Sequence, residues 1–94
     1  MTEKKQLELS ARAIANLGAI KKHIASENPI AADRVINSVF LVIDHLLEHP
    51  MMGHAGRRAN TRELVLPTYP YTVIYRVTAT KVIIAAVLHQ RQKH

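Results

Sequence analysis

The chain has 94 residues, of which 48% are hydrophobic and 21% charged, which fits one domain over residues 1–94 and excludes disorder over most of the chain. Its longest strictly apolar run is Val82–Leu88, which excludes a membrane-spanning helix of about 20 residues. It has no cysteine, which excludes disulfides and thiolate metal sites. We therefore expect a cytoplasmic protein. The net charge of +6 lies entirely in residues 57–94, which hold seven Lys or Arg and one acid, Glu63, and this asymmetry favours a nucleic acid or an acidic protein segment as partner over a merely soluble basic surface.

The N-terminal half predicts two helices. Gln6–Ser10 alternates weakly and indicates either a short strand or the lead-in to a helix, with Ser10 as the N-cap. Apolar residues then recur at helical spacing up to Ala25. Asn28-Pro29 is a typical helix start, and a second helix is expected over Pro29–Glu48. The short link between the two helices predicts an antiparallel hairpin.

The C-terminal half predicts a sheet. Residues 49–60 contain a proline and two glycines without periodicity and are expected to form a loop. Alternating segments predict strands at Thr61–Leu66, Tyr71–Thr78 and Lys81–Leu88.

The last predicted strand is apolar on both faces. Alternation places Ile83, Ala85 and Val87 on one face and the other apolar residues of the strand on the opposite face. Two helices can cover only one of these faces. We therefore expect a partner protein to cover the second face, the alternative being that the sheet curls enough to shelter it.

Several short motifs occur in an order that resembles the RelE/ParE superfamily of toxins from bacterial type II toxin–antitoxin modules. They are S-x-x-A at Ser10–Ala13, N-P-x-A-A at Asn28–Ala32, P-x-x-G at Pro50–Gly53 followed by Arg57 and Arg58, T-R-E-L at Thr61–Leu64, P-Y-x-x-x-Y-R-V at Pro70–Val77, and V-L-H from Val87. The resemblance implies an α+β fold in which an N-terminal helical hairpin packs on a small, twisted, mostly antiparallel sheet. It also implies a cognate antitoxin, bound partly as a wrapped segment. We expect no cofactor.

The superfamily has two chemistries. One branch resembles a ribosome-dependent messenger-RNA endonuclease, and the ParE-like branch poisons DNA gyrase by binding. The endonuclease relatives commonly use a tyrosine near the C-terminus, but no tyrosine follows Tyr75 here. We therefore favour a ParE-like gyrase inhibitor. The alternatives are an endonuclease acting on messenger RNA at the ribosome and an inactive relative that only binds antitoxin.

The residues that would carry these functions are mostly cationic. Arginine bonds two oxygens of a phosphate or carboxylate at once, and the expected contacts to phosphate or an acidic partner are Arg57, Arg58, Arg62, Arg76 and Arg91. For Arg62 and Arg76 a structural ion pair is the alternative, with Asp44 as a possible partner of Arg62. For RNA cleavage the candidate bases are His54 and His89, since histidine titrates near neutral pH.

An apolar face is expected to receive the antitoxin. Its residues are Ile83, Ala85, Val87, Tyr71 and Tyr75. For the two tyrosines the alternatives are packing in the core and stacking on a nucleic-acid base. His45 and His49 have the spacing of helical metal ligands but lack a third ligand, so no metal site is expected.

Overall fold

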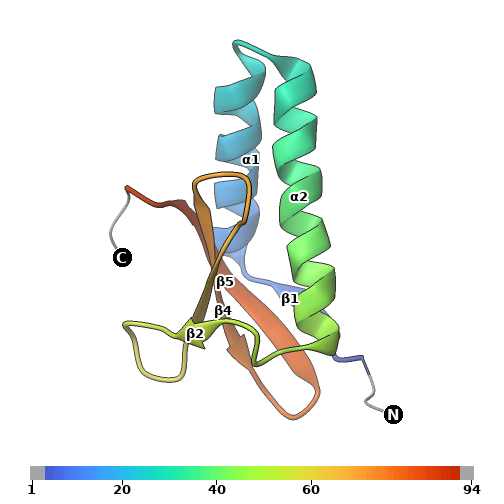
Figure 1. The fold of residues 1–94 in the computed structure, drawn as a ribbon, viewed down its shortest axis with the longest axis vertical. Helices are drawn as coiled ribbons and strands as arrows, with labels where there is room; N and C mark the ends of the chain where they lie inside the picture. Colours follow the sequence, from blue (N-terminus) through green and yellow to red (C-terminus); the bar gives the residue numbers. More distant parts are fainter. Residues whose placement is uncertain (1–3, 92–94) are drawn as a thin grey trace.

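A computed structural model describes residues 4–91, which form two helices and five strands. The elements are β1 (Gln6–Leu9), α1 (Ala11–Ala25), α2 (Pro29–Glu48), β2 (His54–Ala55), β3 (Arg62–Val65), β4 (Tyr71–Val77) and β5 (Lys81–His89). The strands form one sheet in the order β1-β5-β4-β3-β2, in which only the β1–β5 pair is parallel. The helices lie side by side and extend beyond one end of the sheet (Figure 1). The predicted α+β fold with a helical hairpin on a mostly antiparallel sheet is confirmed.

Each helix begins at its predicted cap. The hydroxyl of Ser10 accepts the Ala13 N–H at 3.0 Å and donates to the carbonyl oxygen of Ala85 at 2.9 Å, so the cap also fixes α1 to β5. Asn28 accepts the Ala31 N–H at 3.1 Å, directly before the proline that opens α2. Of the two readings of residues 6–10, the strand is the one observed. Within residues 4–91, neither helix is both long and apolar enough to cross a membrane.

The main core lies between the helices and one face of the sheet. It contains Ala13 and Leu17 of α1, the apolar residues of α2 that face the sheet, and the residues of β4 and β5 that face the helices. Its fully buried side chains of largest volume are Tyr75, Ile43, Leu46, Ile84, Val39, Val73, Val82 and Val87.

A bulge in β5 changes which residues share a face. Tyr75 pairs with Ile84 and Ile74 pairs with Ala86, so Ala85 is an extra residue without a partner on β4. Such a residue reverses the alternation beyond it, and Val87 therefore joins the helix-side core together with the residues before the bulge.

The expectation that five residues form one antitoxin-facing surface is therefore wrong as to their placement. Tyr71, Tyr75 and Val87 are buried in the helix-side core, and Ala85 packs with the cluster on the opposite face. For Ile83, which is half-buried, binding of an antitoxin stays a prediction, as it does for Ala85. Both tyrosines pack in the core, which is one of the two alternatives given for them above.

The second face of the sheet also differs from the expectation. Ile74, Ala86 and Leu88 form a small cluster there and are at most 5% exposed without any partner. The bulge increases the local twist of the strand, so the alternative in which the sheet shelters these side chains itself is the one observed. The expected loop at 49–60 also contains the two-residue strand β2, which pairs with β3.

Candidate functional site

The loop after α2 is tied to the sheet by one tyrosine. The Tyr75 hydroxyl accepts the Gly53 N–H at 2.8 Å and donates to the carbonyl oxygen of Pro50 at 2.8 Å. A Cβ atom at Gly53 would lie 2.6 Å from the Tyr75 hydroxyl and 2.7 Å from the carbonyl oxygen of Glu63, so only glycine fits this contact. Tyr75 is thus a structural residue of the loop, not a platform for a base.

Arg62 is hydrogen-bonded to the same loop. Its Nη2 donates to the carbonyl oxygens of Met51, at 3.1 Å, and Gly53. The suggested pairing with Asp44 is wrong, because that carboxylate accepts a hydrogen bond from Lys4 at 2.5 Å. The Lys4 bond holds the pKa of the Asp44 carboxyl below its ordinary value and raises the pKa of the lysine. Arg62 therefore has a structural role in the loop, but its partners are backbone carbonyl oxygens and not the carboxylate expected for an ion pair.

The loop between β2 and β3 presents two arginines in a fixed turn. The Gly56 N–H donates to the carbonyl oxygen of Thr61 at 2.8 Å, and the Thr61 hydroxyl donates to that of Arg58 at 2.7 Å. Asn60 closes the turn with a φ of 63°, a conformation that asparagine tolerates. Arg57 and Arg58 are both exposed on this turn.

A groove of about 240 Å³ joins this turn to the far face of the sheet. It is lined by arginines from three elements, Arg12 of α1, Arg58 of the turn and Arg76 of β4. The sequence had indicated Arg58 and Arg76 but not Arg12, because no linear spacing connects the start of the first helix to residues 58 and 76.

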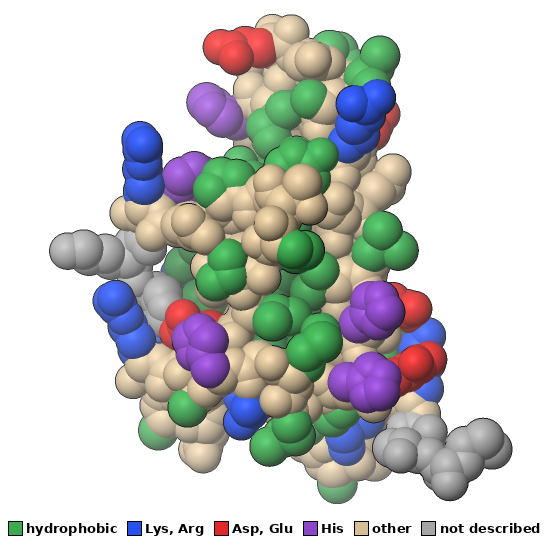
Figure 2. Space-filling model, viewed as in Figure 1, with side chains coloured by type: hydrophobic (Ala, Val, Ile, Leu, Met, Phe, Trp, Pro, Cys, Tyr) green, Lys and Arg blue, Asp and Glu red, His purple; other side chains and the backbone are tan. Residues whose placement is uncertain are grey.

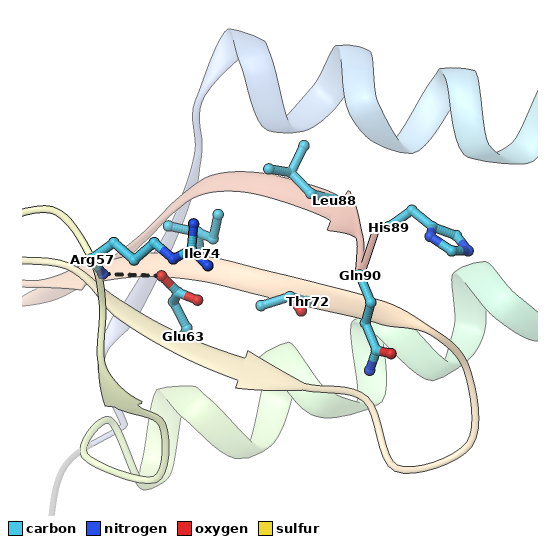
Figure 3. Close-up of a pocket in the computed structure, with 7 residues that line it drawn as sticks. All are labelled: Arg57, Glu63, Thr72, Ile74, Leu88, His89 and Gln90. Atoms are coloured by element: carbon cyan, nitrogen blue, oxygen red, sulfur yellow. Dashed lines mark hydrogen bonds between the residues drawn. The ribbon is translucent and has the colours of Figure 1, made fainter. Parts of the chain in front are cut away.

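A smaller cavity of about 90 Å³ adjoins the same turn (Figure 3). Its lining comprises Arg57, Glu63, Thr72, Ile74, Leu88, His89 and Gln90. The Arg57 N–H donates to Oε2 of Glu63 at 3.2 Å. In Figure 3 the His89 ring points away from the Arg57–Glu63 pair. Glu63 also lines this cavity, and no sequence pattern had indicated it as a site residue.

The two candidate histidines lie on strands β2 and β5, which β3 and β4 separate in the sheet. The His89 ring stands edge-on to Tyr71, with centroids 5.4 Å apart and an interplanar angle of 83°. His54 is exposed on β2, with Nδ1 at 3.0 Å from the carbonyl oxygen of Ala55. Arg91 is exposed, and its N–H donates to Nδ1 of His89 at 3.1 Å. Among residues 4–91 no three acidic or histidine side chains gather in a way that would hold a metal ion.

An apolar groove lies on the helix side of the molecule. It has about 250 Å³ and runs between α2 and the turn that joins β3 to β4, with the apolar lining Leu41, Val42, Leu66, Pro67 and Tyr69. Leu41 is 65% exposed, and Figure 2 shows hydrophobic side chains reaching the surface on this side. An exposed apolar groove of this kind is typical of a surface that binds another protein.

The fold defines the class of protein. The structure is similar to that in the chromosomal ParDE toxin–antitoxin system of P. aeruginosa, with a TM-score of 0.84 at 20% identity over 94% of this chain and 98% of the other. It is also similar to a chain of the RelBE2 toxin–antitoxin complex of Mycobacterium tuberculosis, with a TM-score of 0.64 at 21% identity over 93% and 99% of the two chains. The molecule therefore has the fold of RelE/ParE toxins.

The sequence comparisons define the family. Residues 7–94 match the family described as the ParE toxin of the type II toxin–antitoxin system parDE. The protein Y4kP of Sinorhizobium fredii is 37% identical over 90 residues, covering 96% of this chain and 93% of its own. Toxin RelE3 of Caulobacter vibrioides is 30% identical over 91 residues, covering 95% and 98%. The chain belongs to the ParE toxin family of type II toxin–antitoxin systems, within the RelE/ParE superfamily.

Proposed function

We propose that this toxin inhibits DNA gyrase by protein–protein binding in the cytoplasm and is neutralised by a cognate antitoxin. The observation that carries the proposal is the separation of the candidate catalytic groups. The Arg62 guanidinium is bound to loop carbonyls, Arg58 and Arg76 line one groove, and the ring of His89 packs on Tyr71. General acid–base cleavage of RNA needs a base, an acid and cations around one phosphate, whereas binding needs only surfaces.

The surfaces supply what binding requires. One is apolar, along α2, and the other is cationic, on the far face of the sheet. Apolar contact contributes most of the free energy of protein association, and charge complementarity adds specificity and speed. Two such surfaces could therefore bind a gyrase subunit and, at another time, an antitoxin.

A second candidate function rests on the smaller cavity. Arg57, Glu63 and His89 all line it, although the His89 ring points away from the Arg57–Glu63 pair (Figure 3). A carboxylate and a histidine are groups able to act as base and acid in cleaving messenger RNA on the ribosome. Under this candidate, His89→Gln or Glu63→Gln would abolish cleavage of ribosome-bound message.

The two functions are separated by parallel assays on the purified chain. We expect inhibition of gyrase supercoiling of relaxed plasmid, with ribosome-bound message left intact. Message cleavage without supercoiling inhibition would contradict the proposal and support the endonuclease. Inactivity in both assays, with the antitoxin still bound, would identify an inactive relative that only binds antitoxin.

A further inference from the structure

The helical hairpin exposes apolar side chains on the side that carries an ion pair between its two helices. Near the link that joins α1 to α2 (Figure 1), Lys21 Nζ lies 3.9 Å from Asp33 Oδ1. Ile14 precedes Lys21 by seven residues and Phe40 follows Asp33 by seven, and seven residues make about two helical turns. Ile14 and Phe40 therefore lie at one height on the side of the hairpin that carries the ion pair. They are 57% and 41% exposed.

An unfilled space adjoins these two side chains. Gly18 lies about one turn along α1 from Ile14, and a Cβ atom at Gly18 would have nothing within 4 Å. Side chains on a helix lean towards its N-terminus, and the N-terminus of α2 is at the link, so Phe40 leans towards the height of Gly18. We call the surface formed by Ile14, Gly18, Lys21, Asp33 and Phe40 the outer hairpin face. It carries both a protruding ring and, on the other helix, a space of similar height.

The two helices of the hairpin carry opposite charge. α1 contains two lysines and one arginine and no acidic residue, whereas α2 contains three acidic residues and one arginine. The net charge of the chain lies in residues 57–94. The hairpin is thus the part of the chain in which like-charge repulsion opposes association of two copies least.

We propose that the outer hairpin face binds the same face of a second copy of this chain. A two-fold axis parallel to the helices places α1 of each copy against α2 of the other, so that neighbouring helices run antiparallel in a four-helix bundle. The basic helix then faces the acidic helix twice. A two-fold axis across the helices would instead place α1 on α1 and α2 on α2, with like charges opposed. The charges therefore select the first arrangement.

This arrangement pairs side chains that stand at the same height. Lys21 of each copy meets Asp33 of the other, and Phe40 packs beside Ile14 and over Gly18. Within one chain the Lys21 and Asp33 side chains are 59% and 68% exposed, so their pair contributes little and both groups are accessible to a second copy. The acidic C-terminal end of α2 also comes level with the N-terminus of α1 of the other copy, where acids are favoured and where α1 has none.

A charge exchange tests the interface. Sedimentation equilibrium of the full chain between about 1 μM and 1 mM should show dimers. We expect Lys21→Asp and Asp33→Lys each to weaken dimerisation at least about tenfold, because each places like charges opposite one another twice. A mixture of the two variants should form mixed dimers with nearly the parental affinity, since every charge again meets its opposite. The fold of either variant alone cannot produce such a recovery.

Two further variants test the apolar contact. Gly18→Gln fills the space with a better helix former, so it should keep or raise the melting temperature while weakening the dimer at least about fivefold. Phe40→Ala should weaken the dimer to a similar extent. Leu41→Ala is the matched control, because Leu41 is exposed on the same helix but lines the apolar groove on its other side. It should change the affinity less than about twofold.

Several results would overturn the proposal. They are a chain that stays single up to the highest concentration, two charge variants that do not associate when mixed, and a loss in Leu41→Ala equal to that in Phe40→Ala, which would place the contact in the apolar groove. If Gly18→Gln impairs gyrase inhibition or antitoxin binding in a chain that never dimerises, the face belongs to that partner instead.

The interface is independent of the target of the toxin. Dimers with the expected variant pattern, in a chain that leaves gyrase active, would disprove gyrase inhibition and keep the interface. Gyrase inhibition by a chain that never dimerises would do the reverse. Thermal unfolding of each variant shows whether any loss of affinity reflects loss of the fold.

Discussion

At the scale of single residues, Tyr75 shows how one side chain fixes a loop that the sequence leaves undefined. Its ring is fully buried in the core, and its hydroxyl lies between the Gly53 N–H and the carbonyl oxygen of Pro50. A spacing of two tyrosines along a strand cannot distinguish this role from a binding role. The distinction depends on a loop more than twenty positions earlier in the chain.

Tyr75→Phe therefore tests the loop anchor. The substitution keeps the ring but leaves the buried Gly53 N–H without its acceptor, and we expect the free energy of unfolding to fall by about 1–3 kcal/mol. Urea denaturation measures the change. Tyr71→Phe is the matched control, because it removes the same atom from the same strand without touching the loop. Equal losses in the two variants would contradict the anchor role.

At the scale of elements, β5 is stabilised by two different neighbours along one edge. The first half of the strand pairs with β1, from Lys81 to Ile84. Beyond the bulge the strand is bonded to α1, because the side-chain oxygen of Asn16 accepts the Val87 N–H at 3.0 Å. A side-chain amide thus continues the hydrogen bonding of the strand edge where β1 has ended.

Asn16→Ala tests this edge contact. The Val87 N–H would lose its acceptor within a buried residue, so we expect a loss of about 1–3 kcal/mol in unfolding free energy. Hydrogen exchange of the Val87 amide, followed by NMR, should become faster. Asn37→Ala, at an exposed position of α2, is the control and should leave this amide unchanged. Unaltered exchange at Val87 in Asn16→Ala would show that the edge contact adds no protection.

At the scale of the whole molecule, one ion pair links the start of the described chain to α2. Lys4 and Asp44 are forty positions apart and both are exposed. The lowered pKa of Asp44 means that this pair stabilises the fold above the ordinary carboxyl pKa, and that the stabilisation is lost as pH falls through the lowered value. The raised pKa of Lys4 means that it is also lost as pH rises through the lysine pKa.

Asp44→Asn should therefore flatten the dependence of the melting temperature on pH on the acid side. We expect the variant and the parent chain to converge below the lowered pKa of Asp44, where the carboxyl of the parent is also neutral. Added salt should reduce the difference at neutral pH, because the pair is exposed. Asp33→Asn on the same helix is the control. A constant difference down to the lowest pH would show that the substitution acts by another route.

The sequence by itself determined the two helices and the three C-terminal strands in their order, but it left β1 open between a strand and a helix lead-in and did not predict β2. Helical spacing, the caps at Ser10 and Asn28 and the alternation of the C-terminal strands are local signals, and each depends on neighbours within a few positions. Together with the motif order they were sufficient for the fold and the family. They also identified most of the arginines that line the two hollows on the far face of the sheet.

The tertiary structure decided which of these residues act together. The bulge at Ala85 exchanges the two faces of β5 at its end, and no local pattern predicts the position of one extra residue in a ladder. The meeting of Arg12 with Arg58 and Arg76, and the commitment of Arg62 to loop carbonyls, likewise depend on how distant segments pack. Contacts between such segments are set by the packing of the whole core, which short-range spacing does not encode.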